Sequence, residues 1–553
     1  MRKLGFLVAV LLLLGSGIWA GAESDEAYVT LLYGDEFVLG VRVLGKSIRD
    51  TGTAKDMVVL VTDGVSDYAQ RLLKADGWIL EHIKLLANPN HVRPKRFWGV
   101  YTKLKIFSLT KYRKVVYLDA DTIVVKSIED IFKCGRFCAN LKHSERMNSG
   151  VMVVEPSETV YQDMMSKVNS LPSYTGGDQG FLNSYYADFA SAHVFEPNIP
   201  KQEINSKSEP DMQRLSTLYN ADVGLYMLAN KWMVDEKELR VIHYTLGPLK
   251  PWDWWAAWLI KPVEVWQNIR ERLEETLPGT GGGRNPHDQL VIKFLFLLPF
   301  CLLFLCYYQP CLQVNMDLFS LSCQSSLCGF ARHAFYKYKS GGGLPGYSSV
   351  GVAFSSIANT NQQFSNGVHS KLPAYLGAIS VLICFISAAI SLALAFVIIP
   401  QQVMPLTGLL LMYEWAFVTF FLIFGSYLRL VYLWGNANQV DYGSPDSSDH
   451  HTGKGHQLST SNCNLKTWFY WIGMAFLALA APLLPSLLGI TALFARLGLM
   501  VVGGLVVASF MTYASEHLAI RAFVEGMKAQ HLGLSFVQFG GQILGLLCIE
   551  PCT

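Results

Sequence analysis

The stretch Val115-Val116-Tyr117-Leu118-Asp119-Ala120-Asp121-Thr122 determines how the first half of this chain folds. Its mostly apolar start leads directly into two carboxylates that lie two positions apart, as in a buried strand that ends at a polar edge. Alternate side chains of an extended chain point to the same face, so Asp119 and Asp121 can both reach one ion. Open α/β sheets bind ligands beyond the carboxyl ends of their strands. The pattern therefore predicts a metal site, although Asp-x-Asp also occurs in turns and solvated loops.

Two hard oxygen ligands favour Mg²⁺ or Mn²⁺, and both ions favour a diphosphate as their further ligand. The expected site is therefore one for a metal and a diphosphate-bearing substrate.

The composition places a large part of the chain in a membrane. Of the 553 residues, 51% are hydrophobic and 16% are charged, whereas soluble domains carry about 25% charged residues. The chain is too long for one ordinary domain. Its net charge of +2 gives no indication of a nucleic-acid partner.

Residues 1–22 have the pattern of a secretory signal peptide. Arg2 and Lys3 precede an apolar run that ends near Leu14, and a group of small residues at 20–22 offers a cleavage site. An uncleaved N-terminal anchor is the alternative. Both interpretations place the following domain in the lumen, because positive charge stays on the cytoplasmic side.

Residues 25–275 alternate strand-like and helix-like stretches, which predicts an α/β domain with a mostly parallel sheet. The expected strands are 28–32, 57–61, 115–118 and 150–154. The expected helices are 38–49, 67–75, 99–109 and 179–186. Within this domain, Cys134 and Cys138 lie close enough in sequence for a disulfide, with two separate buried thiols as the alternative.

A linker at 276–289 leads into an all-α membrane domain at 290–513. Five stretches are long enough, or nearly so, to cross an apolar core of about 30 Å. They are 290–308, 374–399, 406–434, 468–486 and 497–513.

The distribution of Lys and Arg supports a lumenal first domain. Counting spans from it places the loops 309–373 and 435–467 and the tail 514–553 in the cytoplasm, and all three contain basic residues. The short loop Gln401–Pro405 falls in the lumen and has none. This asymmetry agrees with the positive-inside rule.

Four further motifs surround the Asp pair in the first domain. The run 29–35 passes from a strand into a turn, Asn148-Ser149-Gly150 precedes a strand, Gly176–Gly180 opens a helix, and His243–Trp252 follows a strand. Each motif alone is explained by a turn, a helix cap or an ordinary histidine. Together, and in this order, they resemble glycosyltransferase family 8, the glycogenin-like enzymes, from about Tyr28 to Trp252.

The resemblance implies a GT-A fold, which is Rossmann-like, and a retaining transfer from a UDP-sugar that depends on Mn²⁺, with Mg²⁺ as a possible substitute. It implies that Asp119, Asp121 and His243 bind the metal. The positions that it implies for substrate binding are Thr30, Leu31, Phe37, Arg96, Lys103, Asp119, Ala120, Asp121, Asn148, Ser149, Gly150, Asp178, Gln179, His243, Gly247 and Lys250. The chain departs from the family pattern by one additional residue between His243 and Gly247, which affects the expected diphosphate contact of Gly247.

The catalytic residues that we expect are Asp178, Gln179 and Lys250. A lysine supplies a mobile point charge for the departing diphosphate, and amides both donate to and accept from sugar hydroxyls. Asp178 is the motif carboxylate placed to touch the sugar. It acts as a nucleophile or orients the sugar while UDP leaves on the side of the acceptor, and we favour orientation.

Five tryptophans between Trp252 and Trp266 precede the first expected span. They lie in the lipid headgroup layer or pack the base of the catalytic domain. Both interpretations tether the site near a membrane, which favours a lipid acceptor because tethering raises its local concentration.

The resemblance, narrowed by the membrane spans, implies a multi-pass Golgi enzyme that glucuronosylates the sphingolipid inositol phosphorylceramide. Lys142, His143 and Arg146 precede the Asn148 motif, where a cation can meet the carboxylate of glucuronic acid; a solvated basic turn is the alternative. The alternatives are a UDP-glucose-dependent transferase that primes a polysaccharide, and a polytopic scaffold or transporter with an inactive transferase-like domain. Glu414 inside the third span is a weak indication of transport.

Overall fold

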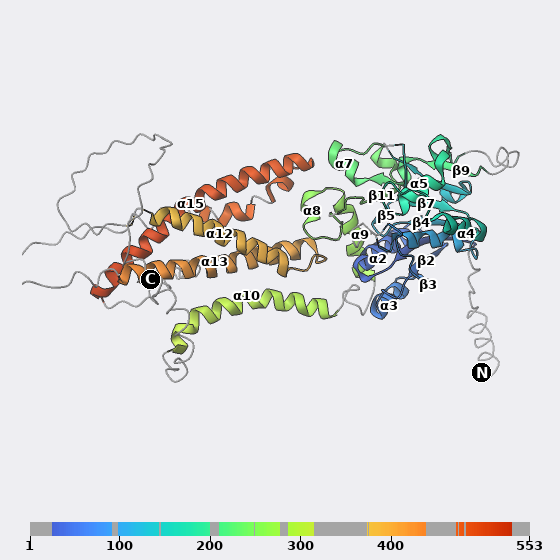
Figure 1. Cartoon of the computed structure of the whole chain (residues 1–553). Helices are drawn as coiled ribbons and strands as arrows, with labels where there is room; N and C mark the ends of the chain where they lie inside the picture. Colours follow the sequence, from blue (N-terminus) through green and yellow to red (C-terminus); the bar gives the residue numbers. More distant parts are fainter. Residues whose placement is uncertain are drawn as a thin grey trace, which may run out of the picture. The chain divides into compact units, whose positions relative to one another are not determined.

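The computed structural model divides into two compact units, and the first holds residues up to 291 together with 400–409 and 480–502. Figure 1 shows strands and short helices in the blue to green part of the chain and long helices in the yellow to red part. The residues that the structure describes are 25–90, 98–142, 145–198, 210–247, 249–276, 286–313, 373, 375–437, 472–473, 475–480 and 483–532. The expected signal peptide and most of the expected linker lie outside these ranges.

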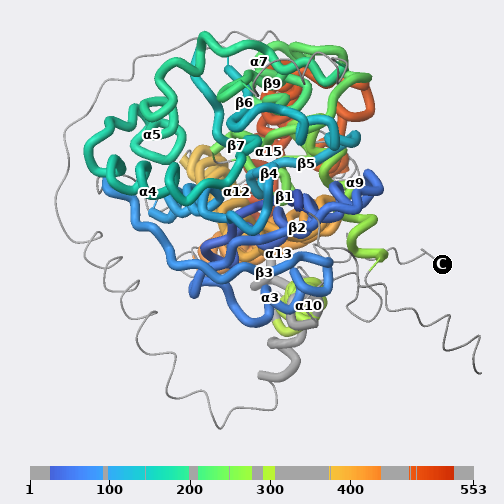
Figure 2. The backbone as a smooth tube through the Cα atoms, turned by 90° about the vertical axis from the view of Figure 1, so that its right-hand side faces the viewer, coloured from blue at the N-terminus to red at the C-terminus, as the bar shows by residue number. Residues whose placement is uncertain are grey.

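The first unit contains an eight-stranded sheet in the order β3-β2-β1-β4-β7-β6-β9-β8, and Figure 2 labels its strands from β3 to β9. Neighbours are parallel except where β7 meets β4 and β6. The strands are β1 Glu26–Leu32, β2 Asp56–Val61, β3 Ile79–His82, β4 Lys114–Leu118, β6 Phe137–Leu141, β7 Met147–Val154, β8 His193–Val194 and β9 Met212–Leu215. The prediction of a mostly parallel α/β sheet is therefore confirmed.

A small second sheet lies at the end of β4. Its order is β10-β11-β5, with β5 at Thr122–Val124, β10 at Ala221–Asp222 and β11 at Val241–His243. The chain enters β5 directly after the Asp119–Asp121 turn, so this sheet joins the turn to the strand that ends in His243.

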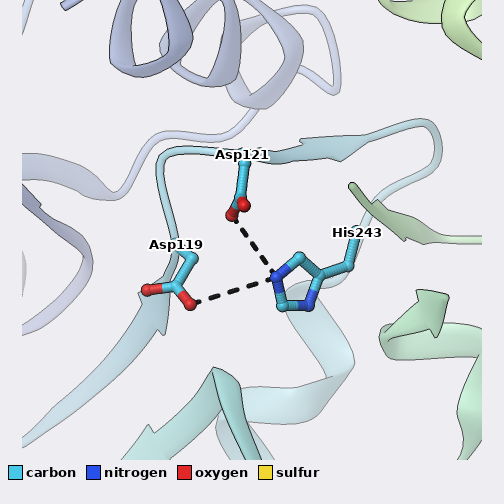
Figure 3. A group of neighbouring side chains, drawn as sticks. All are labelled: Asp119, Asp121 and His243. Atoms are coloured by element: carbon cyan, nitrogen blue, oxygen red, sulfur yellow. Dashed lines mark ion pairs between the residues drawn. The ribbon is translucent and has the colours of Figure 1, made fainter. Parts of the chain in front are cut away.

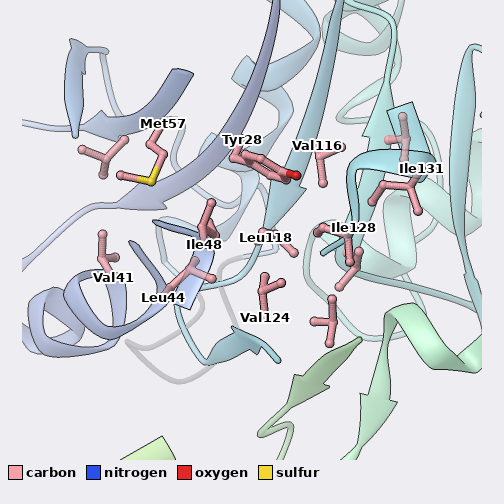
Figure 4. Packing of buried hydrophobic residues seen from close by; sticks show 14 of the residues in the cluster. Tyr28, Val41, Leu44, Ile48, Met57, Val116, Leu118, Val124, Ile128 and Ile131 are labelled. Atoms are coloured by element: carbon pink, nitrogen blue, oxygen red, sulfur yellow. The ribbon is translucent and has the colours of Figure 1, made fainter. Parts of the chain in front are cut away.

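Helices cover both faces of the large sheet, and its central strands are therefore apolar on both faces, as parallel strands usually are. Val116 and Leu118 of β4 pack with Val41 and Leu44 in one cluster (Figure 4). Tyr117 belongs to the cluster on the other face. The helices are α2 Val38–Arg49, α3 Asp67–Ala75, α4 Glu158–Lys167, α5 Asp178–Tyr185, α7 Val223–Ala229, α8 Ala256–Leu259 and α9 Val263–Thr276.

One expected helix has a different form. Residues Val100–Ser108 make a 3₁₀ helix, where the sequence predicts an α-helix at 99–109. The segment is rich in β-branched and aromatic residues, which are poorer α-helix formers than straight-chain residues. Its buried side chains still cover the sheet, with Tyr101, Leu104 and Phe107 in the second cluster.

Cys134 and Cys138 form a disulfide, which decides between the two interpretations of their spacing. Both side chains are buried beside the first cluster.

The tryptophan segment packs into protein for the most part. Trp252, Trp254 and Trp266 are 5%, 3% and 0% exposed. Trp252 and Trp266 join a cluster built on α9, and the backbone N–H of Trp254 donates to the carbonyl of Gln401 within the same unit. These residues support the interpretation that the segment packs the base of the domain.

Three described helices are long and apolar enough to cross a membrane by length and composition. They are α12 Leu376–Ile398, α13 Pro405–Ala437 and α15, whose spanning part is Leu493–Met527. A further helix, α10 at Pro286–Gln313, has a shorter apolar stretch, Leu290–Leu305. Helix α15 continues to Leu532, through residues that the sequence analysis assigns to the tail.

The buried ion pair of Arg42 and Asp76 generates a test of the fold. Arg42 on α2 contacts Asp76 after α3 at 2.6 Å, and the side chains are 5% and 0% exposed. Asp76→Asn removes the carboxylate charge that balances Arg42 in the core, so we expect the free energy of unfolding of the α/β unit to fall by about 3–5 kcal/mol. Urea unfolding followed by tryptophan fluorescence measures the loss. The exposed Asp63→Asn serves as control, and an equal effect of both variants would contradict the assignment.

Candidate functional site

The ends of two strands, β4 and β11, bring the expected metal ligands together. Asp119 and Asp121 leave β4 in a tight turn, and His243 ends β11. The turn is held on both sides, because the Asp119 N–H donates to the carbonyl of Gly150 and the Tyr244 N–H donates to the carbonyl of Asp121, each at 2.9 Å. One ligand atom from each of Asp119, Asp121 and His243 lies within 4.8 Å of the others.

The imidazole faces both carboxylates, as Figure 3 shows. His243 Nε2 lies 3.3 Å from Asp121 Oδ1 and 4.0 Å from Asp119 Oδ2. Two carboxylates and one imidazole are a donor set that divalent transition metals accept. The residues present therefore fit a cation such as Mn²⁺.

Two lysines balance these carboxylates. Lys250 Nζ lies 2.6 Å from Asp121 Oδ2, and Lys103 Nζ lies 2.9 Å from Asp119 Oδ1 and 2.9 Å from Asp178 Oδ2. Burial opposes the charge of Asp121, but Lys250 and His243 outweigh it and hold the pKa of Asp121 well below its usual range. Burial likewise opposes the charge of Lys103, but the carboxylates of Asp119 and Asp178 outweigh it and raise its pKa. Both groups remain ionised at neutral pH.

The expected sugar-binding residues form a second group beside Lys103. Asp178 begins α5, and its Oδ2 accepts from the Ser149 hydroxyl at 2.8 Å. Gln179 Oε1 accepts from Asn148 Nδ2 at 3.0 Å, and Gln179 Nε2 donates to the Tyr174 hydroxyl at 3.0 Å. The loop before α5 turns at Gly176, whose φ is 70°. The amides of Asn148 and Gln179 thus lie next to the Asp178 carboxylate.

Gly150 serves the site through its lack of a side chain. A Cβ at this position would lie 2.1 Å from Cε1 of His243, so the imidazole is in contact with the backbone of β7. Gly40 has the same relation to the turn, because a Cβ there would lie 2.5 Å from the carbonyl oxygen of Ala120. The backbone of Ala120 therefore packs closely against α2.

Of the residues expected around uridine, Thr30 and Leu31 lie in β1 and Phe37 directly precedes α2. Thr30 is fully buried and Leu31 is 7% exposed. Both residues pair with β2, whereas the pairing of β1 with β4 ends at Val29. Phe37 is half-buried and meets Trp252 edge-on, with ring centroids 5.6 Å apart.

Two further expected positions, Arg96 and Gly247, stay predictions. Arg96 lies outside the described residues. Gly247 is exposed in the loop after β11, and the structure describes no contact of it with the carboxylates.

Three functional candidates were missed by sequence reasoning. Tyr117 donates to Asp119 Oδ1 at 2.8 Å, and their spacing of two on a strand was a signal for this contact. Burial, with Asp119 as a further cause, raises the pKa of Tyr33 to about 12, so this phenol stays neutral beside the site. Asn220 Oδ1 lies 2.9 Å from His243 Nδ1, and no local pattern signals it.

The chain is similar to known glycosyltransferases. The family model described as Glycosyl transferase family 8 matches residues 28–136. Inositol phosphorylceramide glucuronosyltransferase 1 of Arabidopsis thaliana is 59% identical over 522 residues, which are 94% of this chain and 95% of that protein. UDP-glucuronate:xylan alpha-glucuronosyltransferase 1 of the same plant is 35% identical over 239 residues, 42% of this chain and 33% of that protein.

One further relative and one solved structure each match less than half of this chain. Glycogenin-1 of Mus musculus is 31% identical over 240 residues, 42% of this chain and 66% of that protein. A crystal structure of the galactosyltransferase LgtC with donor and acceptor sugar analogues matches with a TM-score of 0.33 and 17% identity, over 44% of this chain and 94% of that one.

The contact of His243 with Gly150 predicts the effect of one added methyl group. Gly150→Ala must displace the imidazole, so we expect the affinity for Mn²⁺ to fall about 10- to 100-fold, the usual range when the orientation of a metal ligand is lost. Calorimetric titration with Mn²⁺ measures the affinity. Gly425→Ala is the matched control, because a Cβ at Gly425 meets nothing within 4 Å. Unchanged affinity in Gly150→Ala would exclude His243 as a ligand.

Proposed function

Because the chain belongs to glycosyl transferase family 8, we propose that it is a retaining glucuronosyltransferase that transfers glucuronic acid from UDP-glucuronate to inositol phosphorylceramide. The observation that carries this proposal is the identity of 59% with an inositol phosphorylceramide glucuronosyltransferase along nearly the whole of both chains, membrane part included. The convergence of Asp119, Asp121 and His243 supports an intact site.

Asp119, Asp121 and His243 hold Mn²⁺ in this proposal. The imidazole favours Mn²⁺ over Mg²⁺, which prefers ligands that are all oxygen. A bound cation supplies Lewis-acid stabilisation of the negative charge that develops on the departing UDP.

The two lysines have separate tasks. Lys250 lies beside Asp121, and its flexible side chain can follow the diphosphate as a point charge. Lys103 is buried between Asp119 and Asp178. It therefore fixes the distance between the carboxylate of Asp119, which binds the metal, and the carboxylate of Asp178, which contacts the donor sugar. It is a positioning group, whereas Lys250 contacts the leaving group.

The surroundings of Asp178 favour orientation of the sugar over nucleophilic attack. Its Oδ2 accepts from Ser149 and pairs with Lys103, and both interactions stabilise the carboxylate where it lies. Asn148 and Gln179 offer amide groups that suit sugar hydroxyls. In this arrangement the acceptor hydroxyl attacks the anomeric carbon on the face from which UDP departs, the bond from that carbon to UDP breaks, and the hydroxyl proton passes to the departing diphosphate, which retains the configuration.

The acceptor is a lipid and the site faces the Golgi lumen. Three helices able to cross a membrane keep the enzyme at the bilayer, where tethering raises the effective concentration of a lipid substrate. The disulfide of Cys134 and Cys138 fits an oxidising secretory compartment.

Arg146 recognises the carboxylate of glucuronic acid. It is exposed, and its guanidinium lies 4.0 Å from the centre of the Tyr174 ring, whose hydroxyl accepts from Gln179. Lys142 is engaged elsewhere, because it pairs with Asp222 at 3.2 Å. His143 lies outside the described residues.

The main test uses microsomes that contain the full chain, UDP-glucuronate and inositol phosphorylceramide. Wild type is expected to glucuronosylate the lipid with Mn²⁺ and to lose activity when the ion is chelated. Asp119→Asn is expected to lower the rate on the order of 1,000-fold, since several kcal/mol of stabilisation are lost. Asp211→Asn, in an exposed ion pair with Arg136, is the control. Full activity of Asp119→Asn, or no lipid product from wild type, would refute the proposal.

Donor choice is tested separately with Arg146→Gln. A charged hydrogen bond contributes about 1.5–3 kcal/mol, so kcat/KM for UDP-glucuronate is expected to fall about 10- to 100-fold while that for UDP-glucose stays the same. Arg136→Gln is the control for loss of an exposed arginine. An equal fall for both donors would assign Arg146 to folding, and faster turnover of wild type with UDP-glucose would reject glucuronate as the donor.

A further inference from the structure

We infer that Asn220 is a positioning residue that makes the metal ligand His243 and the sugar-binding Asn148 one hydrogen-bonded unit. The inference rests on the proposed function and adds to it a residue that holds the cation site and the donor sugar in register. Asn220 is fully buried between a short 3₁₀ helix, Thr217–Tyr219, and β10.

Four contacts with other side chains fix the position of Asn220, and one of them runs from Lys142 Nζ to its Oδ1 at 3.5 Å. Its Nδ2 lies 2.8 Å from Asn148 Oδ1, its Oδ1 lies 2.9 Å from His243 Nδ1, and its carbonyl accepts from Lys142 Nζ at 3.1 Å. Strand β10, which follows it, pairs in parallel with β11, so the backbone that carries Asn220 runs beside the backbone that carries His243.

The hydrogen bonds determine which atom of each amide faces which partner. The backbone N–H of Gly150 can only donate, and it lies 3.0 Å from the oxygen of the Asn148 amide. With that oxygen fixed as an acceptor, Asn220 must present its NH₂ group to Asn148. The side-chain oxygen Oδ1 of Asn220 then faces His243, so the imidazole Nδ1 must donate a hydrogen bond to it.

In its neutral form, an imidazole that donates from Nδ1 keeps its lone pair on Nε2, the atom of His243 that faces Asp121 and Asp119. Three electron-rich groups then converge on one point, an arrangement that a divalent cation stabilises. A histidine that ligates a metal generally donates its other ring N–H to a fixed acceptor, which sets its orientation and basicity. Asn220 supplies that acceptor here.

The side-chain amide of Asn148 extends the hydrogen-bonded unit to the residues expected to bind the sugar. Asn148 donates to Gln179 Oε1 at 3.0 Å, so a continuous path runs from His243 through Asn220 and Asn148 to Gln179. Displacing His243 therefore displaces Gln179, because the oxygen and the NH₂ group of both Asn220 and Asn148 are engaged in hydrogen bonds along this path. Lys142 restrains the path from outside through its ion pair with Asp222, whose Oδ1 also accepts from the backbone N–H of Gly224 at the start of α7.

Two substitutions separate the two halves of the role. Asn220→Asp keeps an oxygen for His243 and removes the NH₂ group that Asn148 needs, whereas Asn220→Ala removes both. We expect Asn220→Ala to weaken Mn²⁺ binding to the full-length protein about 10- to 100-fold. Asn220→Asp should bind Mn²⁺ and UDP within a few-fold of wild type, but should lose the additional affinity that the glucuronosyl group gives UDP-glucuronate over UDP.

Calorimetry with Mn²⁺, UDP and UDP-glucuronate measures these affinities without requiring turnover. Asn140→Ala removes another buried amide, which donates to the carbonyl of Leu215, and should leave Mn²⁺ binding unchanged. Circular dichroism reports whether each variant folds, and the isosteric Asn220→Asp carries the test if Asn220→Ala does not fold. Wild-type affinities in both Asn220 variants would overturn the role of Asn220, whereas failure of wild type to bind Mn²⁺ and UDP would instead overturn the proposed function.

Discussion

The balance of buried charge at the end of β4 is the constraint on which the rest of the structure depends. Taking a carboxylate out of water costs several kcal/mol unless a partner compensates it, and Asp119, Asp121 and Asp178 lie side by side. Lys103 and Lys250 offset their charges. Each lysine comes from a different segment. One edge of the sheet must therefore bring together four segments: the 3₁₀ helix, the turn after β4, the start of α5 and the loop after β11.

The sequence was most informative where a pattern is local. Alternation and helical periodicity predicted α2 and α3 to the residue, and an apolar run ending in Asp119 and Asp121 predicted a polar sheet edge. The antiparallel insertion of β7 could not be predicted, because strand direction leaves no trace in composition. Asn220 was missed for a related reason: its partners His243 and Asn148 lie 23 and 72 positions away, and only tertiary packing brings them together.

The three described helices that are long and apolar enough to cross a membrane overlap the stretches 374–399, 406–434 and 497–513, but hydropathy did not predict where α15 ends. It measures the run of apolar side chains, whereas a helix continues as long as its backbone hydrogen bonds are satisfied. Helix α15 thus extends well past the apolar stretch at 497–513. Aromatic content was similarly ambiguous, since tryptophan suits both a headgroup layer and a protein core. The burial of Trp252, Trp254 and Trp266 could be decided only from the packed structure.

The link between Cys134 and Cys138 has a practical consequence for producing this protein. The two cysteines belong to the first core cluster, and the carbonyl of Cys134 also accepts from Lys114 Nζ. Bacterial cytosol keeps thiols reduced, so recombinant material made there would carry two free sulfhydryls in this core. Expression through a eukaryotic secretory route, in yeast or insect cells, matches the redox conditions that this covalent link requires.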